Sequence, residues 1–97
     1  MVVYSVRYDS WFGHVFIFST FEKAKEDIIN YVNNPKTFEL DWNLEDVKRD
    51  FEEITTELYG YDTWEEGLRA CSYADINYFL GDFASIEKIE VDVSFWG

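Results

Sequence analysis

VVYSVRYDSWFGHVFIFS, residues 2–19, decides the fold of this chain, because it predicts an opening β-hairpin. Tyr4, Val6 and Tyr8 alternate with other side chains, which is the pattern of a strand with two different faces. The DSWFG run that follows contains the residue types of a turn. His14–Ser19 is apolar on both faces, so we expect the second strand of the hairpin to be the more central one.

A third strand is expected near the other end of the sequence, in IEKIEVDVSF, residues 86–95. Ile89, Val91, Val93 and Phe95 alternate there with acidic and polar side chains. The hairpin and this distant strand must pair in one antiparallel sheet, with the intervening helices packed on one of its faces. We therefore predict a two-layer α+β fold with the order β-β-α-(β)-α-α-β.

The first helix is predicted directly after the hairpin. Ser19 and Glu22 have the spacing of a capping box, and apolar residues recur at helical intervals over 21–32. Pro35 disfavours helix at the residue before it, so the helix should end there. The next residues, 37–42, alternate in character, and we interpret them as a short edge strand.

The second helix is predicted from Asn43, which has the right side chain to cap it. An apolar seam at intervals of three and four then indicates a buried face. Gly60 should end the helix. The residues of the expected seam are Leu44, Val47, Phe51, Ile54 and Leu58.

Two shorter helices are expected before the last strand. Asp62 should cap the third, with Trp64, Leu68 and Cys71 facing the core. The run SYAD should start a short fourth helix that ends at Gly81.

The composition indicates one acidic domain, residues 1–97, with Asp and Glu at 20 positions and Lys and Arg at eight, a net charge of −12. Such a charge repels nucleic acids and anionic membranes, and it attracts basic protein surfaces. Nine Phe, seven Tyr and four Trp exceed what one small core normally holds. Some aromatic rings should therefore be exposed, and exposed aromatic clusters often mark interfaces.

A cytoplasmic protein is expected. Cys71 is the only cysteine, so no intramolecular disulfide can form, which suits a reducing compartment. The apolar N-terminal stretch contains Arg7 and Asp9 and no basic leader, so we expect neither a signal peptide nor a membrane span.

Catalytic and cofactor motifs do not emerge from the sequence. His14 is the single histidine, and nothing places it beside Cys71. No glycine-rich phosphate loop and no Cys/His cluster for zinc is present. The run Asp46–Lys48 has the acid-x-lysine form of metal nucleases, but it falls on the polar side of a helix. We therefore expect no enzyme, no cofactor and no metal.

Acidic residues concentrate between Glu39 and Glu66, where eleven acids accompany two bases, Lys48 and Arg49. On the second helix an acidic row shares one face, and a row of carboxylates at that spacing can imitate phosphates. Glu45–Arg49 and Arg49–Glu53 pairs would neutralise part of that face, as on an ordinary solvated helix. The acidic row is Asp46, Asp50, Glu53 and Glu57.

The run ELYGYDTWEEGL, residues 57–68, combines aromatic rings and acids around Gly60. Its rings either fill a helix junction or form a patch that binds a partner rich in Arg and Lys. We favour the patch, and its expected partner-binding residues are Tyr59, Tyr61, Asp62, Glu65 and Glu66.

In its acidity, its small size and its lack of catalytic residues, the chain resembles phage-encoded inhibitors of host defence of the anti-CRISPR and anti-restriction types. That resemblance implies a DNA mimic that binds the basic surface of a nucleic-acid-binding enzyme. LYGYDTWEEGL also resembles the tyrosine–glycine–acid run before a helix in barstar-like ribonuclease inhibitors, which have a different strand order. Two alternatives remain open: an immunity or antitoxin protein for a basic toxin, and an acidic adaptor without an inhibitory role.

Overall fold

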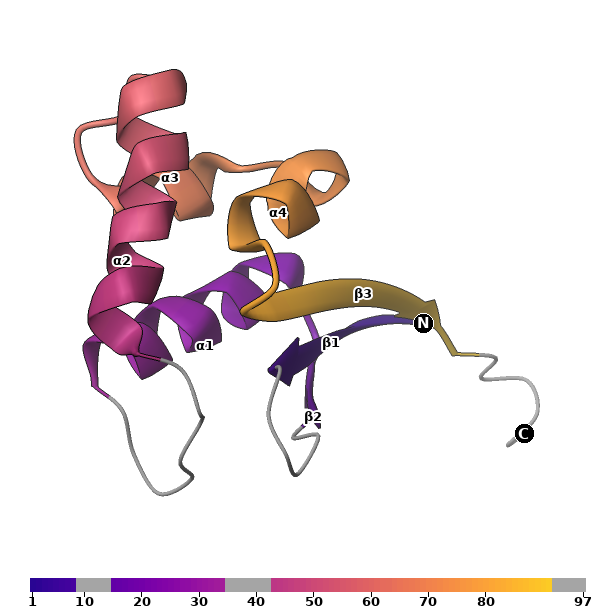
Figure 1. Cartoon of the computed structure of the whole chain (residues 1–97). Helices are drawn as coiled ribbons and strands as arrows, with labels where there is room; N and C mark the ends of the chain where they lie inside the picture. The colour runs from indigo at the N-terminus through magenta and orange to yellow at the C-terminus, as the bar shows by residue number, and fades with distance from the viewer. Residues whose placement is uncertain (9–14, 35–42, 92–97) are drawn as a thin grey trace.

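The computed structural model describes residues 1–8, 15–34 and 43–91 (Figure 1). The three strands of these residues form one antiparallel sheet in the spatial order β2-β1-β3. The predicted α+β fold is confirmed, whereas the expected edge strand at 37–42 lies outside the described residues. The elements are β1 (Val2–Tyr8), β2 (Val15–Phe18), α1 (Phe21–Asn33), α2 (Leu44–Glu52), the π-helical segment η1 (Glu53–Leu58), α3 (Trp64–Ala70), α4 (Tyr73–Leu80) and β3 (Ala84–Glu90).

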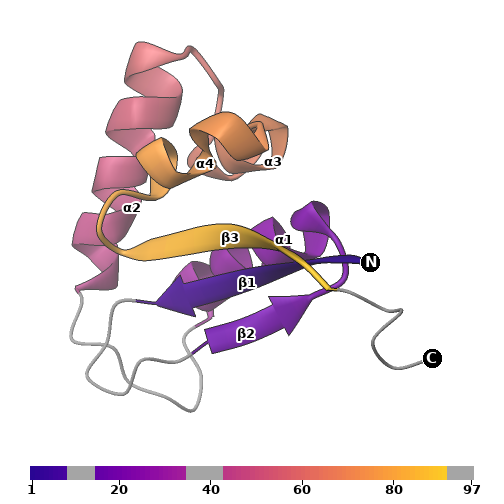
Figure 2. The ribbon, with the colours of Figure 1, turned by 90° about the vertical axis from the view of Figure 1, so that its right-hand side faces the viewer.

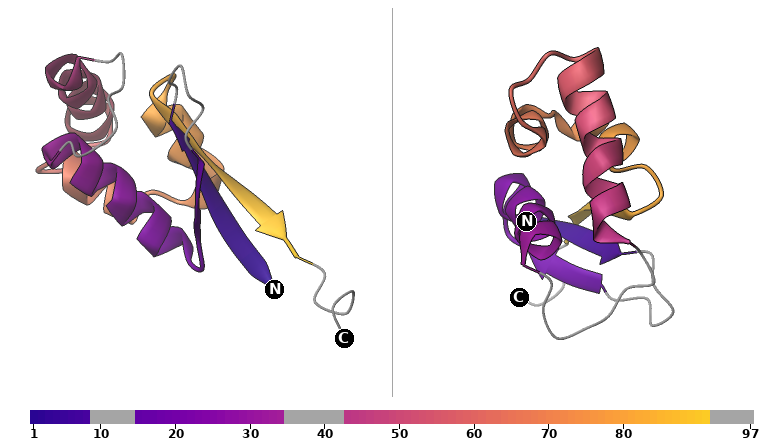
Figure 3. Two further views of the ribbon diagram at one scale, coloured as in Figure 1. Left: turned by 90° about the horizontal axis from the view of Figure 1, so that it is seen from below. Right: turned by 60° about the vertical axis from the view of Figure 1, so that its left-hand side comes forward.

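The helices are arranged around one face and one edge of the sheet. Helix α1 packs against β1 and β2, and α2 and α3 pack against α1 (Figure 3). Helix α4 lies along β3, so that β2 is left at the opposite edge (Figure 2). Of the helices in the described ranges, none is long and apolar enough to cross a membrane.

The core lies between the sheet and the helices. Val6 and Tyr8 of β1 are buried there, as their alternation predicts, and they pair in register with Ile86 and Ala84 of β3. The closing strand expected in residues 86–95 is observed as β3. It begins at Ala84 and buries Ala84 and Ile86, while Ile89, one of the alternating apolar residues, is half-buried. Val93 and Phe95 lie outside the described residues.

The position of β2 differs from the sequence-based expectation of a more central strand. Strand β1 is the central one, because β3 pairs with its other side. Strand β2 is therefore an edge strand, and its apolar residues on the face away from the helices are exposed. The exposed fraction is 46% for Val15 and 58% for Ile17.

Threonine or asparagine side chains cap the starts of α1, α2 and α3. The Asn43 side chain accepts a hydrogen bond from the Glu45 N–H at 3.0 Å, so this predicted cap is confirmed. The predicted caps Ser19 and Asp62 were wrong by one residue. Thr20 Oγ1 accepts from the Lys23 N–H, and Thr63 Oγ1 accepts from the Glu66 N–H, each at 3.1 Å. A hydroxyl that directly precedes the first helical residue is placed to reach the third N–H, and the preceding side chain is one position too early.

The seam of the second helix is buried only in its first half. Val47 and Phe51 are 2% and 1% exposed, whereas Leu58, at 68%, contradicts the prediction. The reason is η1, whose wider turn shifts the helical register after residue 52. Thr55 takes the buried position instead, and its hydroxyl donates to the Phe51 carbonyl at 2.7 Å. The other two seam residues, Leu44 and Ile54, are half-buried.

Apart from the cap of α3, the last two helices follow the prediction. Trp64, Leu68 and Cys71 are buried. Gly60 follows η1 with φ +78°, and Gly81 follows α4 with φ +61°. Both values lie in the region where a side chain is strained, so glycine is the residue that allows each helix to end in this way.

A buried cation ties α1 to the end of α3. Lys25 is 5% exposed, and its Nζ donates to the carbonyls of Arg69 at 2.6 Å and Cys71 at 3.0 Å. These carbonyls belong to the C-terminal end of a helix, where positive charge is favourable. The same Nζ lies 4.4 Å from the centre of the Phe21 ring. Burial nevertheless lowers the pKa of Lys25 below its ordinary value.

Two buried acids predict a loss of stability at alkaline pH. Burial raises the pKa of the Cys71 thiol to about 11, and burial and the Asp27 carboxylate raise the pKa of Tyr8, whose hydroxyl donates to Asp27 at 2.8 Å. Both pKa values are higher in the folded state, so their contribution is complete below the ordinary pKa values and is lost as pH rises above them. Lys25 acts in the opposite sense.

The test therefore compares urea unfolding of wild type and Tyr8→Phe from pH 8 to pH 12. We expect the free energy of unfolding of wild type to decline more steeply above about pH 10, where the unfolded-state phenol ionises. Parallel curves for the two proteins would contradict the assignment to Tyr8.

Candidate functional site: an acidic groove

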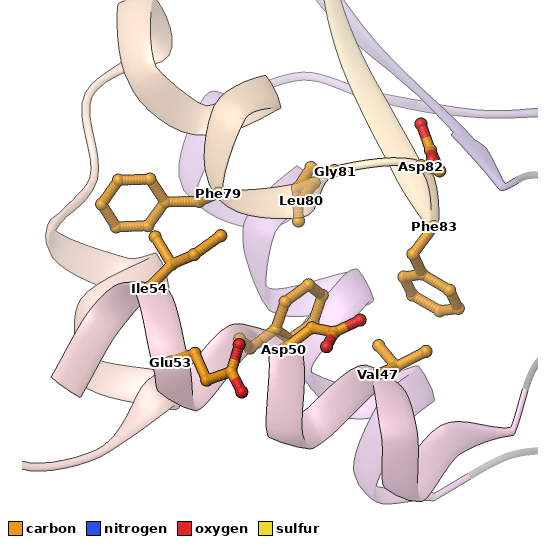
Figure 4. A pocket seen from close by; sticks show the side chains of 10 residues that line it. Val47, Asp50, Glu53, Ile54, Phe79, Leu80, Gly81, Asp82 and Phe83 are labelled. Atoms are coloured by element: carbon orange, nitrogen blue, oxygen red, sulfur yellow. The ribbon is translucent and has the colours of Figure 1, made fainter. Parts of the chain in front are cut away.

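A groove with a volume of about 290 Å³ lies between α2–η1 and the turn that joins α4 to β3 (Figure 4). Its lining is mostly apolar and includes three acidic residues. Residues 25 to 36 positions apart in the chain thus meet in one depression. The lining consists of Val47, Asp50, Phe51, Glu53, Ile54, Phe79, Leu80, Gly81, Asp82 and Phe83.

Helical spacing explains why one wall carries both kinds of side chain. Val47 and Phe51 are four residues apart and face the core, so the intervening Asp50 stands at the edge of that face. Glu53 and Ile54 follow on the next turn, at the start of η1. Figure 4 shows Asp50, Glu53 and Ile54 along this helical wall.

The opposite wall is built by the end of α4 and the turn after it. Phe79 and Leu80 are buried at 3% and 2% exposure, and Phe83 at 2%. Gly81, with its positive φ, reverses the chain between them. This turn places Asp82 on the far side of the groove from Asp50, as Figure 4 shows.

The three groove carboxylates form no ion pair among the described residues. Both bases of α2 form ion pairs elsewhere: Lys48 Nζ lies 3.8 Å from Glu45 Oε1, and Arg49 Nη2 lies 2.7 Å from Asp46 Oδ1. The expected Arg49–Glu53 and Glu45–Arg49 pairs do not form, so Arg49 neutralises a different acid. The exposed Asp50, Glu53 and Asp82 therefore keep their negative charge available to a ligand.

The predicted acidic row is divided by this arrangement. Asp50 and Glu53 line the groove. Asp46 is exposed and paired with Arg49, and Glu57 is exposed on η1 without lining the groove. Only half of the predicted acidic row borders the groove. The groove therefore describes the candidate site better than the row does.

The two tyrosines of the predicted patch have different environments. Tyr59 is 53% exposed, and its ring centre lies 4.9 Å from that of Phe79, a groove residue. It therefore extends the apolar wall outward. Tyr61 is half-buried, and its ring lies close to Gly67 at the junction of η1 and α3. Tyr59 matches the predicted exposed ring, and Tyr61 matches the alternative of a helix junction.

The remaining predicted residues surround the start of α3. Asp62 and Glu66 are exposed and Glu65 is half-buried, and none of the three lines the groove. They add negative charge at the start of α3 without forming part of the depression.

Sequence reasoning did not identify Asp82, Phe79 or Tyr78 as site residues. Tyr78 is 61% exposed, and its ring centre lies 6.3 Å from that of Phe79. The run GDF at residues 81–83 carried a local signal, since an acid directly after a helix-ending glycine lies on a turn. Its proximity to α2 depends on tertiary packing, which no local pattern reports.

The groove suits a cation with an apolar stem. An Arg or Lys side chain combines methylene groups with a charged end, and it can bury the stem while its charge meets carboxylates. A metal ion would instead need several ligand side chains close together. No group of His, Cys, Asp and Glu close enough to hold a metal ion occurs in residues 1–8, 15–34 and 43–91.

Comparison with known proteins assigns the chain to no family and no function. The chain matches no protein-family model, no curated protein sequence and no solved structure. The geometry and charge of the groove are therefore the basis on which a function is proposed.

Proposed function

We propose that the chain is an acidic inhibitor that occupies the basic nucleic-acid-binding surface of a nuclease or another defence effector. The observation that carries the proposal is the groove, whose lining combines apolar side chains with three exposed acidic residues that form no ion pair among the described residues. The net charge of −12 supports it, because it favours rapid encounter with a basic surface.

In the proposed complex, an Arg or Lys of the enzyme that normally contacts phosphate enters the groove. Its methylene stem lies against Ile54 and Phe79, and its charged end binds the carboxylates of Asp50 and Glu53, while Asp82 adds negative charge on the far wall. Hydrogen bonds of this kind are charge-assisted, and an Arg can form two in parallel with one carboxylate. The enzyme's phosphate-binding residue is then no longer accessible to nucleic acid.

Two exposed rings border this contact and supply its apolar margin. Tyr59 and Tyr78 both pack against Phe79 and are more than half exposed. Aromatic rings beside a charged contact exclude water from it and offer cation–π interactions to further basic residues. Such rings mainly slow dissociation, whereas the exposed carboxylates mainly accelerate association.

The first experiment identifies the partner and tests its class. The immobilised chain is incubated with a bacterial lysate at low salt and eluted with salt, and the eluted proteins are identified by mass spectrometry. We expect a basic nucleic-acid-binding enzyme whose captured amount falls steeply with salt, because exposed charges are screened over about 8–10 Å at ordinary ionic strength. The purified enzyme should also lose activity when the chain is added. A partner that is neutral or acidic, or a basic partner whose activity is unchanged, would contradict the proposal.

A further inference from the structure

The two edge strands of the sheet differ in whether their outward backbone groups are hydrogen-bonded by the rest of the protein. Along β3, the Asn77 side chain accepts from the Ile86 N–H at 2.8 Å and donates to the Ile86 carbonyl at 3.1 Å. The Tyr73 hydroxyl accepts from the Lys88 N–H at 2.8 Å. Side chains of α4 therefore satisfy three of the outward backbone groups of β3, which hinders another strand from pairing there.

The outward backbone groups of β2, in contrast, are not hydrogen-bonded in this way by the described part of the chain. Met1 and Val91 exchange backbone hydrogen bonds, so the odd-numbered residues of β1 pair with β3 and the even-numbered ones pair with β2. In the observed register the even-numbered residues of β1 bond to Phe16 and Phe18. The N–H and C=O groups of Val15 and Ile17 therefore point away from the sheet, and no partner for them occurs among the described residues.

A hollow of about 370 Å³ lies between this edge and α1. Phe18 borders it from β2, and an exposed or half-exposed face of α1 borders it from the other side. Three of the α1 residues are acidic and one is basic. The hollow is lined by Phe18, Glu22, Lys23, Glu26, Asp27 and Asn30.

We propose that the β2 edge binds an extended segment of a partner protein in which basic and apolar residues alternate. The segment adds a fourth strand through the outward backbone groups of Val15 and Ile17. Successive side chains of a strand point to opposite faces. Its basic residues then face the hollow with Glu22 and Asp27, and its apolar residues extend the exposed face of Val15 and Ile17.

Charge complementarity selects this occupant over a second copy of the chain. Pairing of β2 with β2 of another copy would bring two acidic α1 faces together, and each copy carries −12. Like charges within a Debye length repel. This surface is separate from the groove between α2 and α4, so the inference goes beyond the proposed function and does not depend on it.

The probe is the acetylated and amidated peptide (Lys-Val)₄, added to the isotopically labelled full chain and followed by NMR hydrogen exchange. Its control is a peptide of the same composition with the lysines and valines in separate blocks. At a peptide concentration of about ten times the dissociation constant, we expect exchange of the Val15 and Ile17 amides to slow about tenfold, because only free protein exchanges. The block peptide should give less protection.

A matched pair of variants tests the charge requirement. Glu22→Lys should weaken binding of (Lys-Val)₄ by about threefold or more, and Glu52→Lys, the same change on an exposed site of α2, should leave it within about twofold. Equal binding of the block peptide, or protection at the groove instead of at Val15 and Ile17, would overturn the proposal. So would β2 amides that are already protected in the free chain, whether by its own residues or, in a concentration-dependent way, by a second copy.

Discussion

Phe51→Ala is expected to lower the free energy of unfolding by about 3–5 kcal/mol. Phe51 is 1% exposed and connects three parts of the core. Its ring centre lies 5.6 Å from that of Trp64 in α3 and 6.0 Å from that of Phe83 before β3. Removal of the ring eliminates both aromatic contacts and leaves a cavity that the helices cannot fully close.

The control for this experiment is Leu58→Ala. Both residues belong to the apolar seam expected from the sequence, but Leu58 is 68% exposed because η1 shifts the helical register. Urea unfolding should place Leu58→Ala within about 0.5 kcal/mol of wild type. Comparable costs for the two substitutions would mean that the seam is continuous and that the described register of η1 is wrong.

Gly67→Ala is the second substitution with a large expected effect, and it should destabilise the protein by about 1–3 kcal/mol. A Cβ at this position would lie 2.5 Å from Thr55 Cβ and 2.6 Å from Thr55 Cγ2. The position of a Cβ follows from its backbone, so rotation of the Thr55 side chain cannot relieve the closer contact. In an unobstructed helix the same change would stabilise by about 1 kcal/mol.

The source of this cost can be isolated in a double-mutant cycle with Thr55→Gly, which removes both clashing atoms. In that background Gly67→Ala should cost much less than in wild type, because both Thr55 contacts are gone and only the looser approach to Tyr61 Cδ2, at 3.3 Å, remains. Calorimetric or urea unfolding of the four proteins provides the coupling energy. An equal loss of stability in both backgrounds would show that α3 does not approach η1 at this point.

Local patterns predicted most elements of the fold. The alternation of Val6 and Tyr8 and the spacing of Trp64 and Leu68 follow from the local period of strand and helix, and the cap at Asn43 is a contact within two residues. All three are observed. Thr20 and Thr63 were missed as caps by one residue, because neighbouring side chains have almost the same capping chemistry.

The errors arose where tertiary structure decides. An apolar strand such as β2 is compatible with a central or an edge position, and the pairing of β3 with β1 selects the edge. Leu58 was misplaced because nothing in its spacing reports the wider turn of η1. The candidate site was predicted in part: Asp50 and Glu53 line the groove, but Asp82 joins them only through the turn at Gly81.

The central claim is that the groove carboxylates take the place of nucleic acid on a basic enzyme. It is tested most directly by displacement of a short fluorescent DNA or RNA duplex from the captured enzyme. The wild-type chain is compared with Glu53→Lys and Glu52→Lys, which carry the same charge change at adjacent positions. Of these two residues, only Glu53 lines the groove.

We expect wild type and Glu52→Lys to release the duplex at concentrations within about twofold of each other, because isolated surface charges contribute little. Glu53→Lys should require about tenfold more protein, as expected for reversal of one charge that is paired in the complex. A ternary complex of enzyme, duplex and chain, or equal displacement by the two variants, would contradict the account.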